Sequence, residues 1–83
     1  MLLDSIMTKL QLLQCLADEG QADAFEVAEV CDVSYSTAAM ALLRIVRQGL
    51  VARFVDPDRD IFWYSLTPSG HERLAYLSAR ADA

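Results

Sequence analysis

Apolar side chains recur every three or four residues over residues 4–18, which is the spacing of one helical face. Asp4 or Ser5 can cap the start of such a helix, because a short polar side chain accepts a hydrogen bond from the free N–H groups of the first turn. Gly20 follows the last apolar position and suits the left-handed residue after a helix. The pattern therefore predicts a first helix over residues 4–18.

Two more helices are predicted next along the chain. The second runs from a cap at Asp23 to about Cys31, and the third covers residues 35–48, with Ser34 as its cap and Gly49 ending it. On a wheel of about 100° per residue, one face of the third helix is apolar, and we expect that face in the core. It carries Ala38, Ala41, Leu42 and Ile45. The opposite face carries Ser36, Ala39, Met40, Leu43 and Arg47.

After Gly49 the apolar pattern changes to one typical of strands. Residues 50–55 and 61–66 are rich in β-branched and aromatic side chains, and the polar DPDRD segment between them, with Pro57, favours a tight turn. These residues predict a β-hairpin over residues 50–66. Thr67 then caps a last helix, with Pro68 at its first position and an apolar side marked by Leu74 and Leu77.

The predicted order is three helices, a hairpin and a helix, which is an α+β fold that is mostly α. The 83 residues allow one domain over residues 1–83. About 54% of them are apolar, and a chain of this size buries only about 60% of its unfolded surface, so some apolar side chains should remain exposed for another chain. The longest apolar run has six residues, 38–43, and no basic residues precede the first apolar ones, so we expect a soluble, cytoplasmic protein without a membrane helix or leader.

The stretches FEVAEVCDVSYSTAAMALLRIVRQGLV and YSLTPSGHERL together resemble a winged helix-turn-helix domain of the kind found in small MarR, PadR and ArsR-like transcription regulators. The resemblance covers about residues 6–77. It implies that helix 35–48 enters the major groove of double-stranded DNA and that hairpin 50–66 is the wing. It also implies a homodimer that regulates transcription.

Charge is divided between the two halves of the chain. The formal net charge is −5, but residues 1–40 carry seven acidic side chains and one Lys, whereas residues 41–83 carry six Arg and five acidic side chains. An anionic partner should therefore meet the second half. The candidate DNA-binding residues are Ser34, Tyr35, Ser36, Thr37, Met40, Arg44, Arg47, Arg53 and Arg59.

An alternative function is protein–protein interaction with little or no DNA binding. The first two turns of helix 35–48 contain no Arg, Lys, Asn or Gln, the usual partners of guanine and adenine, while Met40 and Leu43 make its outer face apolar. Leu43 is therefore a candidate contact to a partner protein. Leu74 and Leu77 are candidates for a dimer interface, which the first helix could join with Leu12 and Leu16, together with Leu2 and Leu3 just ahead of it.

Other clusters favour structural roles. The three carboxylates of DPDRD begin like a calcium loop, but Ile61 stands where the loop needs Gly, so a solvated turn is the better interpretation. Phe62 and Tyr64 share one face of a strand and Trp63 lies on the other, so packing of one face against the core is a better interpretation than stacking on bases. Cys15 and Cys31 are expected as small apolar residues. We predict no enzyme activity, no metal site and no cofactor.

Overall fold

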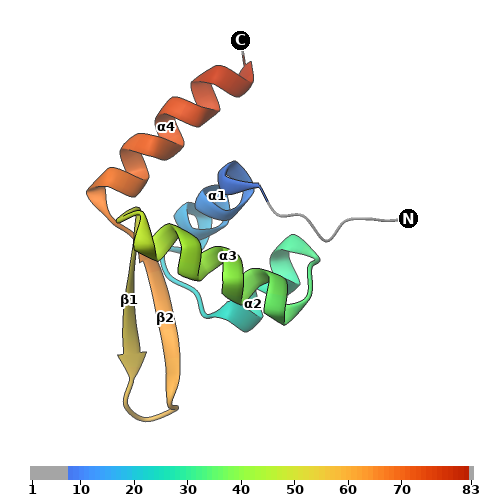
Figure 1. The fold of residues 1–83 in the computed structure, drawn as a ribbon, viewed down its shortest axis with the longest axis vertical. Helices are drawn as coiled ribbons and strands as arrows, with labels where there is room; N and C mark the ends of the chain where they lie inside the picture. Colours follow the sequence, from blue (N-terminus) through green and yellow to red (C-terminus); the bar gives the residue numbers. More distant parts are fainter. Residues whose placement is uncertain (1–7, 83) are drawn as a thin grey trace.

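The structure, a computed structural model, describes residues 8–82. In this range the chain forms four helices and one antiparallel hairpin, in the order α1 (Lys9–Glu19), α2 (Ala24–Cys31), α3 (Tyr35–Arg47), β1 (Val51–Asp56), β2 (Ile61–Leu66) and α4 (Pro68–Asp82). Figure 1 shows α1, α2 and α3 gathered into one body, from which the hairpin and α4 extend in opposite directions. The expected fold class, a mostly helical winged helix, is confirmed.

The first two helices begin with capping boxes. Thr8 Oγ1 accepts from the N–H of Gln11 at 3.1 Å, and Gln11 Oε1 accepts from the N–H of Thr8 at 2.9 Å. Asp23 and Glu26 exchange the same pair of bonds at the start of α2, as the cap at Asp23 predicted. The cap predicted at residues 4 or 5 lies outside the described residues, and α1 instead begins at Lys9, after Thr8. The Thr-x-x-Gln spacing was the sequence signal for this start.

The third helix begins where the sequence predicts and ends one residue earlier. Ser34 Oγ accepts from the N–H of Thr37 at 3.1 Å, so Ser34 is the N-cap. The helix ends at Arg47, and Gly49 has a φ of +77°, the left-handed conformation that a glycine adopts without steric cost.

The core lies between the three helices and the base of the hairpin. The face of α3 predicted to be buried is buried, and it packs with side chains of α1 and α2. Leu12 and Leu16 belong to the same core, with exposed fractions of 2% and 0%, so the expectation that they join a dimer interface is wrong. Leu2 and Leu3, the other two side chains of that expectation, lie outside the described residues.

The hairpin pairs Val51 with Leu66 at its base and Asp56 with Ile61 at its tip. The two aromatic side chains that share one face of β2 differ in burial. Tyr64 is buried, but Phe62, two residues nearer the tip, is 45% exposed. Core packing on one face of the strand is thus found at Tyr64 but does not reach Phe62, because the strands extend beyond the helices that could cover them.

A short backbone segment between α1 and α2 pairs with the hairpin, and the sequence pattern did not indicate it. The N–H of Ala22 donates to the carbonyl of Tyr64 at 3.0 Å, and the N–H of Tyr64 donates to the carbonyl of Ala22 at 2.9 Å. These bonds attach the middle of β2 to the helical body. They hold the hairpin in one direction relative to α2 and α3.

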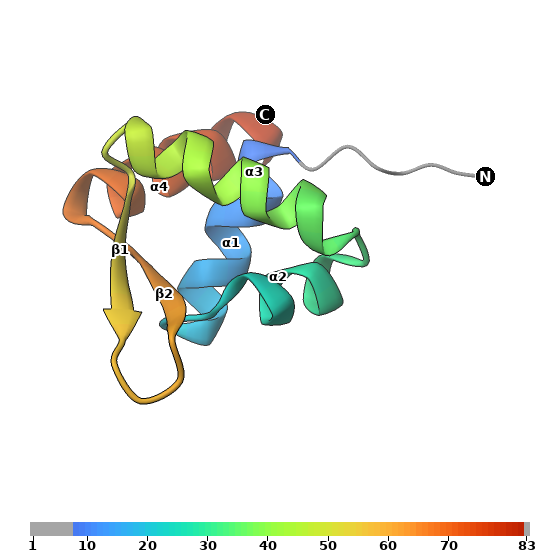
Figure 2. The same ribbon diagram turned by 60° about the horizontal axis from the view of Figure 1, so that its bottom comes forward.

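The base of the hairpin is joined to both neighbouring helices at one junction. The N–H of Leu50 donates to the carbonyl of Ile45, and the carbonyl of Leu50 accepts from the N–H of Thr67 at 3.0 Å. The Thr67 hydroxyl donates to the carbonyl of Gly49 at 2.7 Å and accepts from the N–H of Gly70 at 3.1 Å, as a helix cap. Figure 2 shows β1 leaving directly from the C-terminal end of α3 at this point.

The junction predicts that Gly70→Ala is the more damaging of two glycine substitutions. A Cβ on Gly70 would collide with the Leu50 carbonyl oxygen, whereas a Cβ on Gly49 would meet nothing within 4 Å. Gly49→Ala should therefore lower the free energy of unfolding by only about 1–2 kcal/mol, which is the cost of placing an alanine in the left-handed conformation. Gly70→Ala should lower the free energy of unfolding clearly more, because the backbone at Leu50 or at the start of α4 must move to make room for the methyl group. Urea unfolding of the two variants measures this, and an equal loss of stability in both would contradict it.

Candidate nucleic-acid interface

The outward face of α3 carries both apolar and basic side chains. Met40 is 65% exposed, Tyr35 is 49% exposed, and Arg44 and Arg47 are exposed on the last turns. A shallow groove of about 320 Å³ runs along the C-terminal half of this face. It is lined by Met40, Leu43, Arg44, Arg47 and Gln48, which we call the α3 groove.

The hydroxyl groups at the start of α3 form a local network. Ser34 Oγ donates to Thr37 Oγ1 at 2.9 Å and lies 3.2 Å from Ser36 Oγ. Ser34 also caps the helix, so its first role is to hold the first turn. Ser36 remains exposed at the helix surface.

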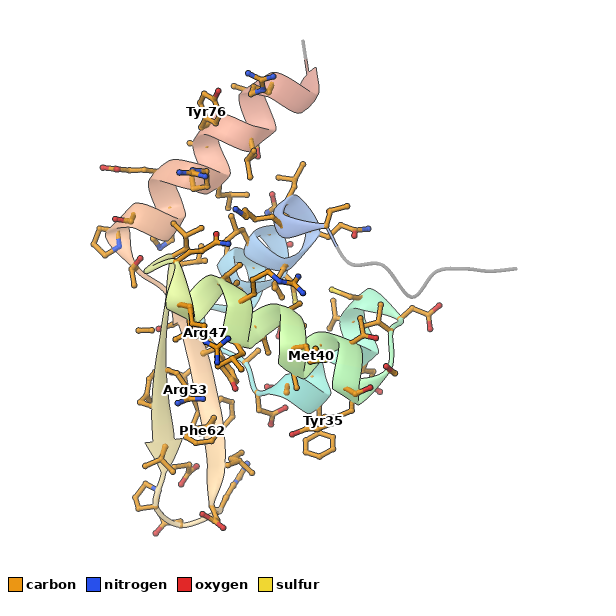
Figure 3. All side chains as sticks on the ribbon, in the orientation of Figure 1. Tyr35, Met40, Arg47, Arg53, Phe62 and Tyr76 are labelled. Carbon is orange, nitrogen blue, oxygen red and sulfur yellow. The ribbon has the colours of Figure 1, made fainter. Side chains whose placement is uncertain are left out.

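The hairpin carries the other two candidate arginines, neither of which lines the α3 groove. The Arg53 guanidinium lies 4.4 Å from the centre of the Phe62 ring, a cation–π contact that restrains the side chain. Arg59 is exposed in the turn at the tip, between the exposed Asp58 and Asp60. Figure 3 shows Met40 and Arg47 along α3 and Arg53 and Phe62 on the hairpin, with Tyr76 far from them on α4.

The DPDRD segment is a hydrogen-bonded turn. Asp56 accepts from the indole N–H of Trp63 at 3.0 Å and from the N–H of Asp58 at 2.9 Å. These two bonds, the one from Trp63 first, lower the pKa of Asp56 below its ordinary value of 3.8. Within residues 8–82 no three His, Cys, Asp or Glu side chains are grouped closely enough to hold a metal ion.

The two cysteines lie on facing sides of α1 and α2. Cys15 is buried and Cys31 is partly buried against the core. Burial, followed by the neighbouring Cys31 thiol, raises the pKa of Cys15 to about 12. A thiol with this pKa is protonated at neutral pH and is a weak nucleophile.

The candidate interface leucines differ in their surroundings. Leu43 is half-buried at the α3 groove, while Leu74 and Leu77 on α4 pack partly against the core of their own chain. On the same helix Tyr76 is 56% exposed, and its hydroxyl accepts from Arg80 at 3.0 Å. None of the helices described is long and apolar enough to cross a membrane.

Sequence reasoning missed one aromatic side chain near the site. Phe25, on α2, is 62% exposed, and its ring stacks on that of Tyr35 with 4.4 Å between centroids. No signal in the sequence indicated a role of Phe25 at the surface. Outward positions of a short helix accept any residue type, so its place just after the Asp23 cap is not informative.

The arrangement of helices and hairpin is similar to that of solved bacterial transcription regulators. A MarR family transcriptional regulator from Silicibacter pomeroyi DSS is 28% identical, with a TM-score of 0.78 over 89% of this chain and 50% of that one. The YusO protein from Bacillus subtilis is 26% identical, with a TM-score of 0.81 over 86% and 51%. A mutant MarR from E. coli complexed with operator DNA is 20% identical, with a TM-score of 0.77 over 82% and 49%.

These likenesses are to a winged helix-turn-helix domain of MarR-like type. The chain spans about half the length of the solved structures it matches. The sequence matches no protein-family profile and no curated protein.

The bonds at the hairpin tip predict how Trp63 responds to pH. Because the pKa of Asp56 is lower in the folded chain than its ordinary value of 3.8, its contribution to stability is present above pH 3.8 and is lost as the pH falls through the folded-state pKa. The indole N–H proton resonance of Trp63 should shift with a midpoint below 3.8. Asp56→Asn should abolish this transition and Asp58→Asn should keep it. A midpoint above 3.8 would refute the proposed cause.

Proposed function

We propose that this winged helix-turn-helix chain binds double-stranded DNA and regulates transcription, with α3 in the major groove and the hairpin of β1 and β2 as the wing. The observation that carries the proposal is the set of exposed arginines on two adjacent elements: Arg44 and Arg47 on α3, and Arg53 on β1. One of the similar solved structures is a MarR complexed with operator DNA.

The arginines are suited to phosphate contacts. Arg44 and Arg47 lie in the last turns of α3, where the major groove wall would pass, and Arg53 is held by the Phe62 ring. Arg59 at the tip completes the set, although Asp58 and Asp60 beside it oppose phosphate. Because each phosphate contact contributes about −0.9 to the salt slope, four contacts predict a slope of about −3.6 per protomer.

The contacts to bases would come from the first turns of α3. Tyr35 and Ser36 are exposed there and have hydroxyl groups that can bond base edges, with Ser34 and Thr37 beside them in the cap network. Met40, 65% exposed, can contact a thymine methyl group. This set contains no bidentate partner for guanine or adenine, so we infer weak sequence preference.

We further propose a symmetric homodimer whose two copies of α3 enter half-sites about 10 base pairs apart. We propose that α4 forms the dimer interface, through the exposed ring of Tyr76 on one side of the helix and the solvent-accessible parts of Leu74 and Leu77 on another.

The phosphate contacts predict that the double variant Arg44→Ala with Arg47→Ala binds DNA more weakly and with a smaller dependence on salt. Removing two of four contacts should change the slope of log affinity against log salt from about −3.6 to about −1.8 per protomer. Fluorescence anisotropy with a mixed-sequence duplex at low salt measures both affinity and slope.

The matched control is Arg73→Ala with Arg80→Ala, which removes the same charge from exposed positions on α4. The control should keep the slope of the unmodified chain. No binding at tens of micromolar, or equal losses in the two double variants, would refute DNA binding through α3.

A second candidate function, a protein-interaction module, is favoured by the apolar part of the α3 groove. Met40 and Leu43 present apolar surface, which packs against another protein rather than against the phosphates of DNA. Leu43→Lys separates the two functions. It should leave non-specific DNA affinity unchanged or stronger if DNA is the partner, whereas it should abolish complex formation with a protein partner. Anisotropy and co-purification of the same variant distinguish these outcomes.

A further inference from the structure

A second hollow lies on the other side of α3's first turn, between α2 and the hairpin. Its volume is about 260 Å³, and we call it the aromatic pocket. Four aromatic side chains and two carboxylates dominate its lining: Phe25, Tyr35, Phe62, Tyr64, Asp23 and Asp60. The six side chains come from α2, α3 and the hairpin, so only the folded chain assembles them.

The rings of the aromatic pocket remain partly open to solvent. Phe25 and Tyr35 stack with centroids 4.4 Å apart and an angle of 30° between ring planes, and they are 62% and 49% exposed. Phe62 is 45% exposed, while Tyr64 is buried and forms the floor. A soluble domain that keeps three aromatic rings exposed around one hollow offers an unused binding surface.

The charge of the aromatic pocket selects the ligand. Among the described residues its lining includes the carboxylates of Asp23 and Asp60 and no basic side chain. Glu26, bonded to the backbone of Asp23, adds a third carboxylate next to it. These groups repel an anion and attract a cation.

Arg53 gives an internal example of the chemistry. Its guanidinium already lies 4.4 Å from the centre of one aromatic ring, that of Phe62. The negative face of an aromatic ring attracts a cation within about 6 Å, and aromatic rings combined with carboxylates bind quaternary ammonium groups. Arg53 and Arg59, the neighbour of Asp60 in the turn, carry two positive charges against the three carboxylates of Asp23, Glu26 and Asp60, so these five charges sum to −1.

We propose that the aromatic pocket binds a small organic cation with a quaternary or tertiary ammonium group. The rings of Phe25, Tyr35 and Phe62 contact its alkyl groups, and Asp23 and Asp60 neutralise its charge. The volume lies just below the usual range of about 300–1,000 Å³ for ligand sites, which suits a ligand of a few heavy atoms. The inference does not depend on DNA binding.

The test uses choline and 3,3-dimethylbutan-1-ol, in which a carbon atom replaces the ammonium nitrogen. The full chain, labelled with ¹⁵N, is titrated with each compound, and backbone chemical shifts are followed. We expect saturable shifts around residues 23–25, 35 and 60–64 with choline, and at least about fivefold weaker binding of the alcohol. Equal binding of the two compounds, or choline-induced shifts confined to α4, would overturn the proposal.

Two variants distinguish choline binding in the aromatic pocket from choline binding elsewhere on the chain. Phe25→Leu with Tyr35→Leu keeps apolar side chains but removes two rings at exposed positions, and it should raise the choline Kd at least about fivefold. The control Tyr76→Leu removes an equally exposed ring from α4 and should leave the Kd unchanged. If the double variant and the control bind choline equally well, the proposal is wrong.

The carboxylate is tested by Asp60→Asn. Asp60 has a φ of +57°, a conformation that Asn also adopts readily, so the hairpin turn should persist. Loss of the charge should raise the choline Kd about threefold at low salt and have a smaller effect at high salt. An unchanged Kd at low salt would count against a cation site.

Discussion

The contact between the carbonyl of Leu50 and the start of α4 determines where the hairpin lies relative to α3. The Leu50 carbonyl accepts from Thr67, and the absence of a side chain on Gly70 lets α4 approach the Leu50 oxygen closely. The Thr67 hydroxyl, between Gly49 and Gly70, satisfies polar groups from two chain segments at once. The end of α3, both ends of the hairpin and the start of α4 therefore meet at one point, and their directions are not independent.

The backbone pair of Ala22 and Tyr64 is the second restraint on the hairpin. With its base held at Leu50 and its middle held at Ala22, the hairpin projects beside the first turn of α3. This position places the tip carboxylate Asp60 near Asp23 of α2, around the aromatic pocket. The arginines of α3 lie along the other end of that helix, at the α3 groove. The acidic and basic surfaces of the folded chain therefore match the acidic and basic halves of the sequence only in part, because Asp60 at the acidic pocket comes from the basic half.

The surplus of apolar residues over what a small core needs is visible on α2, α3, α4 and the hairpin. Phe25 and Val30 are exposed on α2, Met40 on α3 and Tyr76 on α4, and the fourth surface extends along the hairpin. The hairpin surface includes Phe54, Val55 and Phe62. These side chains are exposed because strands that extend past the helical body have nothing of their own chain to pack against.

The sequence alone determined the local features of this protein. The caps at Asp23 and Ser34 and the buried face of α3 could be predicted, because caps and helical faces depend on residues three or four positions apart. The start at Thr8 was missed although the Thr-x-x-Gln spacing signals it, whereas the exposure of Phe62 and the burial of Leu12 and Leu16 depend on which elements cover them. Tertiary structure alone decided the pairing of Ala22 with Tyr64 and the meeting of Phe25, Tyr35 and Asp60. Those contacts join residues far apart in the chain, where no local periodicity records which side chains packing brings together.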